Sequence, residues 1–354
     1  MTDISQRKAD HLDLAGSGDV GFKQTTTLFE CVRLVHDALP ELDFDEVDPS
    51  VTLFGKPLRA PILIAAMTGG HERAERINRE LASIAEERRL AFGLGSQRAM
   101  HKDRARLKSY AVRDVAPTAL VLGNLGVVQA AAMSTAEVED LVGAIDADAL
   151  CVHLNPAMEL VQDDGDRAFR GGLDTLARLA RELPLPVIAK ETGCGLSSRV
   201  GRRLTSAGIR HVDVSGAGGT SWVAVETHRA SEKRRGLGHT FWEWGIPTAA
   251  SVALVAPLGF DTVFATGGVK SGLDIAKAIA LGASAGGIAR PVLQAFERGG
   301  RDAALAYLVQ VETEVRMAML LSGAGNLAAL RQVPRMIGGE LANWLAQEPA
   351  DARR

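Results

Sequence analysis

Two glycine-rich stretches in the last third of the chain have the residue types of a phosphate-binding site. TGGVKSG covers residues 266–272, and GGIARP covers residues 286–291. Glycine lets a backbone approach a ligand closely, and backbone N–H groups at helix N-termini favour a dianionic phosphate. Lys270 adds a positive charge. A single glycine pair also fits ordinary turn chemistry, so the position of both stretches in the fold decides between a phosphate site and plain turns.

Lys190 is a second candidate for chemistry. It ends the apolar run Val187–Lys190 and begins the motif KETGCG. A lysine at the end of a buried strand is costly without a partner, which disfavours a purely structural role. Its ammonium group would stabilise negative charge on the pyrimidine side of a reduced flavin. Together with a phosphate site and a lining of small residues, this lysine points to FMN as the cofactor.

Eight short apolar runs, each ending in small or polar residues, must position these groups. Continuous apolar runs are typical of parallel strands buried on both faces, and helix-like stretches follow them. Eight such units in about 240 residues favour a TIM (β/α)8 barrel over an open doubly wound sheet, whose GxGxxG fingerprint is missing. In a barrel, the glycine-rich loops after the strands all lie on the face that carries active sites. The expected strands are Pro61–Ala66, Leu90–Leu94, Ala119–Leu122, Ala149–Leu154, Val187–Lys190, His211–Ser215, Thr262–Thr266 and Ala285–Ala289.

The chain is longer than a bare barrel. We expect residues 1–354 to form one domain, with an N-terminal arm over about 1–60, the barrel over about 61–300 and C-terminal helices over about 301–354. Between the sixth and seventh strands, Thr220–Thr248 forms a long polar loop at the carboxyl end of a strand. Such a loop is a candidate active-site lid, although a surface insertion or an oligomer contact would explain it equally well.

The overall composition excludes several other classes of protein. The 354 residues include 40 Lys+Arg and 43 Asp+Glu, a net charge of -3, so no basic excess exists for binding nucleic acid or a membrane surface. The three cysteines are too few for a disulfide framework or a zinc site. We see no apolar stretch of about 18 residues and no secretory signal peptide. We therefore expect a cytoplasmic protein with reduced thiols.

Several motifs in a fixed order resemble one known family. The chain resembles the type 2 isopentenyl-diphosphate isomerases from about residue 5 to about residue 335. The resemblance implies an FMN-dependent TIM barrel that converts isopentenyl diphosphate to dimethylallyl diphosphate by a 1,3-allylic proton shift. Reduced FMN would serve as acid and base, and NADPH would only keep the flavin reduced. The motifs are RKADHL, MTGG, GLGSQR, GNLG, VHLNPAMELVQDDGDRAF, KETGCG, SGAGGTSW and TGGVKSG.

The resemblance also implies roles for individual residues and a homotetramer or homo-octamer. Catalytic positions are Lys190, His153 and Met158, and the magnesium ligand is Glu159. Prenyl diphosphate would be bound by Arg7, Lys8, His11, Ser96, Arg98, His153 and Asn155. FMN would be bound by Ala65, Ala66, Met67, Thr68, Ser96, Asn124, Lys190, Thr220, Gly268, Lys270, Ala289 and Arg290.

Met158 departs from the family pattern, which has Gln immediately before the metal-binding Glu. A thioether neither donates nor usefully accepts a proton, so two alternatives stay open. One is an FMN oxidoreductase of the hydroxy-acid-oxidase type, for which His228 and Arg229 are the adjacent candidates for a base and a carboxylate-binding group. The other is a non-catalytic relative that binds FMN or a prenyl diphosphate.

Overall fold

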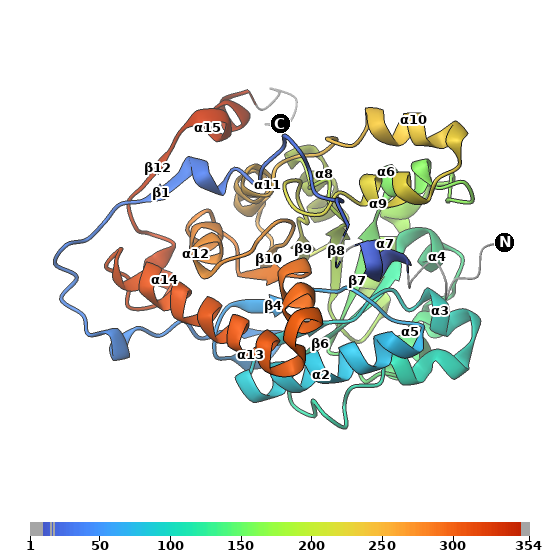
Figure 1. The fold of residues 1–354 in the computed structure, drawn as a ribbon, viewed down its shortest axis with the longest axis horizontal. Coiled ribbons are helices and arrows are strands. Elements are labelled where there is room, and N and C mark those ends of the chain that lie inside the picture. The colour runs from blue at the N-terminus through green and yellow to red at the C-terminus, as the bar shows by residue number, and fades with distance from the viewer. Residues whose placement is uncertain (1–9, 15, 17, 348–354) are drawn as a thin grey trace.

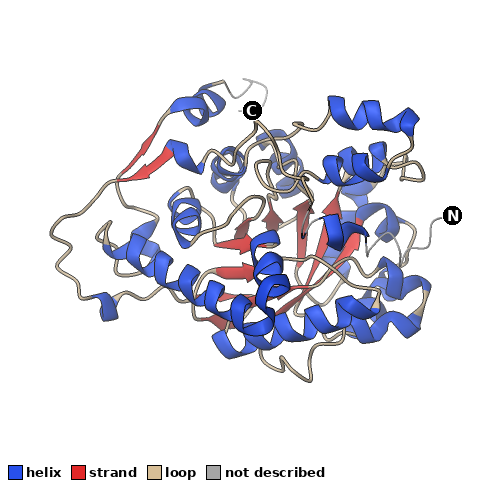
Figure 2. Cartoon of the chain, in the orientation of Figure 1, coloured by secondary structure: helices blue, strands red, loops and turns tan. Residues whose placement is uncertain are grey.

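Eight parallel strands form a closed barrel at the centre of the molecule (Figures 1 and 2). The structure is a computed structural model that describes residues 10–14, 16 and 18–347. The strands follow one another around the barrel in chain order, and the last pairs with the first. Each expected apolar run overlaps one of them, so the predicted TIM barrel is confirmed. They are β4 (Ile62–Ile64), β5 (Ala91–Gly93), β6 (Leu120–Gly126), β7 (Ala149–Leu154), β8 (Val187–Glu191), β9 (His211–Asp213), β10 (Thr262–Ala265) and β11 (Ala285–Ile288).

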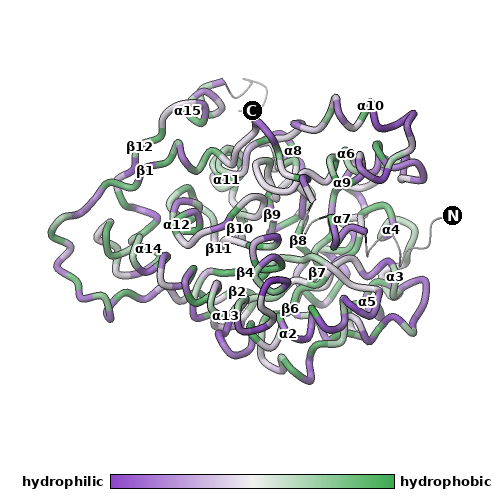
Figure 3. Tube along the Cα trace, viewed as in Figure 1, coloured by the Kyte–Doolittle hydropathy of each residue, from purple (hydrophilic) through white to green (hydrophobic). Residues whose placement is uncertain are grey.

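Helices surround the barrel, and in Figure 3 the outer ones alternate between polar and apolar residues. In the first of them, Ile77, Leu81 and Ile84 are buried, because residues three and four apart share one helix face. The helices are α2 (Glu72–Arg88), α3 (Arg98–Lys102), α4 (Val127–Ala131), α5 (Thr135–Gly143), α6 (Pro156–Val161), α7 (Gly172–Glu182), α8 (Ser198–Ser206), α9 (Trp222–Arg229), α10 (Glu232–Thr240), α11 (Thr248–Val255), α12 (Gly272–Ala280), α13 (Arg290–Leu320), α14 (Leu327–Leu330) and α15 (Gly339–Ala346). No helix of the described residues is both long and apolar enough to cross a membrane.

A hairpin closes the N-terminal end of the barrel. Its strands are β2 (Val51–Leu53) and β3 (Lys56–Leu58), which pair antiparallel. Leu53 and Leu58 pack against side chains from the barrel interior, and the Phe54 ring lies edge-on to His211 at the start of β9. The open end for a ligand is therefore the opposite one, where the strands end.

Two regions differ from the prediction. Thr220–Thr248 is mostly helical rather than a long loop, because Ser221 caps α9 and Ala224 and Val225 pack against Val20 of the N-terminal arm. The C-terminal region is not purely helical. It contains β12 (Arg335–Ile337), which pairs antiparallel with β1 (Val32–Leu34) of the arm (Figure 2). Both features depend on contacts between segments far apart in the chain, which local periodicity does not reveal.

Candidate active site

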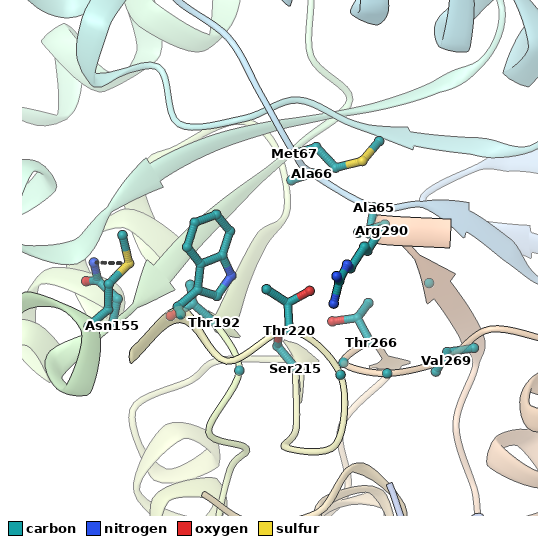
Figure 4. A pocket seen from close by; sticks show the side chains of 18 of the residues that line it. Ala65, Ala66, Met67, Asn155, Thr192, Ser215, Thr220, Thr266, Val269 and Arg290 are labelled. Carbon is teal, nitrogen blue, oxygen red and sulfur yellow. Dashed lines mark hydrogen bonds between the residues drawn. The ribbon is translucent and has the colours of Figure 1, made fainter. Parts of the chain in front are cut away.

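A cavity of about 640 Å³ opens at the carboxyl ends of the barrel strands (Figure 4). Residues that follow all eight strands contribute to its lining. Every site residue implied by the family resemblance lies on this lining if the structure describes it, whereas Arg7 and Lys8 lie outside the described residues. These lining residues are His11, Ala65, Ala66, Met67, Thr68, Ser96, Arg98, Asn124, His153, Asn155, Met158, Glu159, Lys190, Thr220, Gly268, Lys270, Ala289 and Arg290.

Lys190 is buried at the end of β8 and has an acidic partner on the neighbouring strand. Its Nζ lies 2.7 Å from Oδ2 of Asp213 and 3.3 Å from Oγ1 of Thr266. The Thr266 hydroxyl donates to the other Asp213 oxygen at 2.6 Å. Asp213 and Thr266 are absent from our sequence prediction. The signal was available, because a buried lysine requires a counter-charge and HVDVSG places one carboxylate on the next strand.

The glycine-rich turns come together as a cradle of backbone on the other side of the cavity. A Cβ atom at Gly219 would lie 2.3 Å from the backbone nitrogen of Gly268, so two backbones meet where no side chain fits. Gly268 itself has a φ of +73°, a conformation that favours glycine. Helix α13 begins beside this cradle at Arg290, whose side chain extends toward Thr220 in Figure 4. Backbone N–H groups and an arginine are the donors that a phosphate needs.

Two of the predicted phosphate-site cations differ in their surroundings. Arg290 donates from Nη2 to the backbone oxygen of Gly18 at 2.7 Å, so this guanidinium also holds the N-terminal arm against the cavity. Lys270 is exposed, and its backbone oxygen accepts a hydrogen bond from the Tyr307 hydroxyl at 2.7 Å. The Lys270 side chain thus stays at the solvent edge of the cavity.

Glu159 presents a buried carboxylate to the opposite part of the cavity. It lies in the first turn of α6 and is 6% exposed. One oxygen accepts from Nδ2 of Asn155 at 2.9 Å, and the other accepts from the backbone N–H of Asp166 at 2.7 Å. Each oxygen keeps a further lone pair for a hard cation. Because the described residues contain no cluster of three or more metal-ligating side chains, a metal here would need oxygen atoms from a substrate.

The neighbours of Glu159 are a histidine and a thioether. Nδ1 of His153 lies 2.8 Å from Oδ1 of Asn124, which orients the imidazole ring at the end of β7. Sδ of Met158 lies 3.9 Å from Nδ2 of Asn155, the contact drawn in Figure 4. The side chain of Met158 therefore lies on the cavity wall next to Asn155.

His11 connects the N-terminal arm to α9. Its Nε2 lies 2.7 Å from Oε1 of Glu226, and its ring packs edge-on against Trp222. Glu226 is 1% exposed and also accepts from Nη1 of Arg229 at 2.8 Å. Our sequence prediction did not include Glu226, because a lone acid in a segment interpreted as a polar loop carries no signal of burial.

The predicted lid is attached to the N-terminal arm. The Glu243 carboxylate accepts hydrogen bonds from the backbone N–H groups of Lys23, Gln24 and Thr25. Nε2 of His228 lies 3.1 Å from the backbone oxygen of Asp19, and neither His228 nor Arg229 lines the cavity. The two residues considered as the base and the carboxylate-binding group of a hydroxy-acid oxidase are thus engaged elsewhere.

Arg98 lines the cavity and has a buried N–H group for which the described residues provide no hydrogen-bond acceptor. Its Nε is buried and has no hydrogen-bond partner among the described residues. Its Nη1 lies 3.7 Å from an Asp166 oxygen, which is beyond ordinary hydrogen-bond distance. A buried guanidinium N–H without an acceptor is costly, so a bound anion in this cavity would remove that cost.

Glu191 shapes the turn that follows Lys190. One of its carboxylate oxygens accepts from the backbone N–H groups of Thr192, Gly193 and Cys194 at 2.5 to 2.7 Å. Burial raises the pKa of Glu191 from 4.5 to about 7, although the three N–H groups act in the opposite direction. Thr192 and Gly193 line the cavity, so this carboxyl group supports the cavity wall.

This raised pKa predicts how Glu191 affects stability. The folded state binds the proton of Glu191 more tightly than the unfolded state does. The stability that this proton binding contributes is therefore fully present below pH 4.5 and is lost as pH rises through about 7. Glu191→Gln removes this titration. We expect the free energy of unfolding of the native protein, relative to the variant, to fall by on the order of 2 kcal/mol between pH 4.5 and 8 in urea titrations. A constant difference between the native protein and Glu191→Gln over this pH range would contradict the prediction.

Comparisons with known proteins identify the family. The FMN-dependent dehydrogenase family matches residues 152–335. The chain is 45% identical to the isopentenyl-diphosphate delta-isomerase of Halobacterium salinarum, covering 98% of this chain and 97% of the relative. It is 42% identical to the protein of that name from Methanothermobacter thermautotrophicus, covering 99% and 98%. The chain belongs to the isopentenyl-diphosphate delta-isomerase family. The predicted resemblance is confirmed, as is the enzyme class, an isomerase.

Membership of an FMN-dependent family also supports FMN as the cofactor of this isomerase-family chain. Among solved structures, a mandelate oxidase superimposes with a TM-score of 0.64 at 20% identity, covering 92% of this chain and 95% of that chain. At this level of identity the likeness is one of fold, and it agrees with the TIM barrel.

Proposed function

We propose that this protein converts isopentenyl diphosphate to dimethylallyl diphosphate with FMN and Mg²⁺. The observation that carries the proposal is a single barrel-mouth cavity that combines a glycine cradle, a buried lysine and a buried glutamate. Relatives named isopentenyl-diphosphate delta-isomerase, identical to this chain at nearly half of the aligned positions, support the choice of reaction.

The residues present fit FMN. Gly219 and Gly268 meet where no side chain fits, so backbone N–H groups of these turns would bind its phosphate, and Lys190 holds a positive charge at the cavity surface. The other predicted FMN-binding residues come from the ends of β4, β5 and β6 and from the segments after β9, β10 and β11. When bound and reduced, FMN supplies the acid and the base for the allylic proton shift, and NADPH serves only to keep it reduced.

The substrate diphosphate is proposed to bind on the Glu159 side of the cavity. Arg98 supplies the buried N–H that lacks an acceptor among the described residues, and His11 and His153 supply further donors in their protonated forms. Glu159 would hold Mg²⁺, whose charge would offset that of the diphosphate, since this cation keeps most of its waters and needs few carboxylates. Arg7 and Lys8 are proposed to bind the same diphosphate.

The arm and α9 serve to exclude water. Protonating an unactivated alkene produces a tertiary cation that water would trap, so the reacting carbons need an apolar, closed environment. Trp222 and Met158 both line the cavity and provide apolar surface. Hydrogen bonds from the arm to Glu243 hold this cover in place.

The function is tested with the purified protein and its flavin. We expect a yellow flavin spectrum and, after anaerobic reduction with Mg²⁺ present, conversion of isopentenyl diphosphate without net consumption of NADPH. NADPH oxidation in proportion to product would instead indicate an oxidoreductase. Binding of the diphosphate without conversion would indicate the non-catalytic alternative.

Met158 gives a specific prediction for this reaction. Because FMN supplies the proton chemistry, Met158 is compatible with turnover, and Met158→Gln should change kcat by less than about tenfold, well below the roughly 100-fold minimum that is typical for losing a general acid or base. The comparison requires anaerobic kcat and KM for both proteins at saturating Mg²⁺. A gain of 100-fold or more in the variant would show that the native protein is impaired by its thioether.

We further propose that the protein forms a homotetramer or homo-octamer. Leu237, Phe241 and Trp244, on α10 and directly after it, are 49%, 42% and 61% exposed. Large apolar side chains exposed together commonly mark a protein contact surface. Analytical ultracentrifugation of the FMN-loaded protein tests this, and a monomer at micromolar concentration would contradict it.

A further inference from the structure

Asp213 is a buried acid that the proposed reaction does not yet use. It is 1% exposed and does not belong to the cavity lining, whereas its partner Lys190 does. The two residues face each other in register on β8 and β9. Asp213 therefore lies behind Lys190 as seen from the cavity, and it cannot contact a ligand there directly.

Every polar contact of this carboxylate serves to hold it in one orientation. Oδ2 accepts from Nζ of Lys190 at 2.7 Å, while Oδ1 accepts from the Thr266 hydroxyl at 2.6 Å and the backbone N–H of Ser215 at 3.2 Å. Lys190 also contacts the same threonine oxygen. Within the described part of the chain, these contacts use two of the three ammonium N–H groups, which leaves the third for a group in the cavity.

The surroundings of the pair make the counter-charge necessary. Beneath it lie the apolar side chains of Ile188 and Phe264, and burial raises the pKa of the neighbouring Cys151 thiol to about 12, so that thiol is neutral. A buried ammonium group without a paired carboxylate is strongly unfavourable. The Asp213 carboxylate, 2.7 Å from Nζ, therefore compensates the positive charge that Lys190 presents to the cavity.

We propose that Asp213 is a positioning residue that keeps Lys190 charged and directed into the cavity, and thereby favours the reduced, anionic form of bound flavin. The pair acts as a dipole whose positive end faces the ligand. Lys190 beside a neutral amide at position 213 would not produce the electric field of this dipole. The inference rests on FMN as the cofactor, but it does not depend on which substrate the flavin serves.

The test measures FMN affinity in both redox states rather than turnover. In Asp213→Asn we expect the reduced form to lose at least tenfold in affinity relative to the oxidised form. A tenfold change equals about 30 mV in the two-electron midpoint potential, which a dye-coupled reductive titration resolves. The matched control is Asp148→Asn, which removes a carboxylate paired with Arg113 at the other end of the barrel and should leave the potential unchanged.

A double-mutant cycle separates positioning from general structural damage. If Asp213 acts through Lys190, adding Asp213→Asn to Lys190→Met should shift the potential no further, whereas independent effects would add. Thr266→Val leaves the ion pair intact and provides a second test if Asp213→Asn folds poorly; we expect a smaller shift in the same direction.

Other outcomes overturn the inference in distinguishable ways. An unchanged or raised potential in Asp213→Asn, or additive shifts in the cycle, would overturn the role of Asp213 while the proposed function stands. If Asp213→Asn does not fold, an unchanged midpoint potential in Thr266→Val would likewise overturn the role of Asp213. Native protein that binds no FMN would overturn both proposals.

Discussion

Gly219→Ala is expected to yield protein that is purified without FMN. The added Cβ would lie 2.3 Å from the nitrogen and 2.6 Å from the Cα of Gly268, and backbone atoms cannot rotate away as a side chain end does. The two glycine-rich turns must therefore separate, and the N–H groups that bind phosphate move with them. We expect FMN affinity to fall by at least about 100-fold, a loss of roughly 3 kcal/mol in binding free energy.

The control for this variant comes from the same segment of the chain. Gly236→Ala lies in α10, where a new Cβ meets no atom within 4 Å. Alanine is the better helix former, so this variant should bind FMN normally and be slightly more stable. Titrations that follow the quenching of FMN fluorescence compare the FMN affinity of the native protein, Gly219→Ala and Gly236→Ala. A Gly219→Ala protein that binds FMN within twofold of the native protein would show that the phosphate lies elsewhere.

Glu159→Gln should abolish most of the magnesium-dependent activity. The neutral amide loses the charge that attracts the cation, and its NH₂ group would face either the Asn155 amide or the Asp166 N–H, both of which are donors. Losing even an outer-shell partner of a bound metal costs about 10- to 100-fold in affinity or activity. We expect at least that loss in turnover, together with a higher half-saturating Mg²⁺ concentration, while FMN binding is unchanged.

A nearby acid provides the comparison for Glu159. Asp164 belongs to the same acidic segment but is exposed and does not line the cavity. Asp164→Asn removes the same charge and should leave the Mg²⁺ dependence as it is. If both variants respond alike to Mg²⁺, the effect would come from the general acidity of the segment and not from coordination by Glu159.

Much of the site could be predicted because barrel geometry converts sequence position into spatial position. A strand buried on both faces must be apolar over its whole length, so the eight runs can be recognised without any tertiary contact. Once they close into a barrel, the residues after each run necessarily meet at one end. Asn124, Lys190 and Gly268, although far apart in the chain, therefore line one cavity.

The partners of these residues were harder to predict. Asp213 is the one carboxylate on the strand after Lys190, but only the in-register pairing of β8 and β9 shows that the two side chains meet. The role of Glu226 is revealed only by its contact with His11, which lies about 215 positions earlier in the chain. The interpretation of Thr220–Thr248 as a loop failed because α9 is stabilised by the N-terminal arm rather than by a long local repeat.

The glycine-rich stretches, the apolar runs and the family motifs thus establish the barrel, its ligand face and the set of residues on that face, because these follow from local sequence and chain order. Tertiary structure decided the ionic partner of Lys190, the pairing of β1 with β12 and the cover formed by the arm and α9. Each of these depends on distance and orientation between segments distant in sequence. Such contacts gain their free energy only after the barrel has brought those segments together.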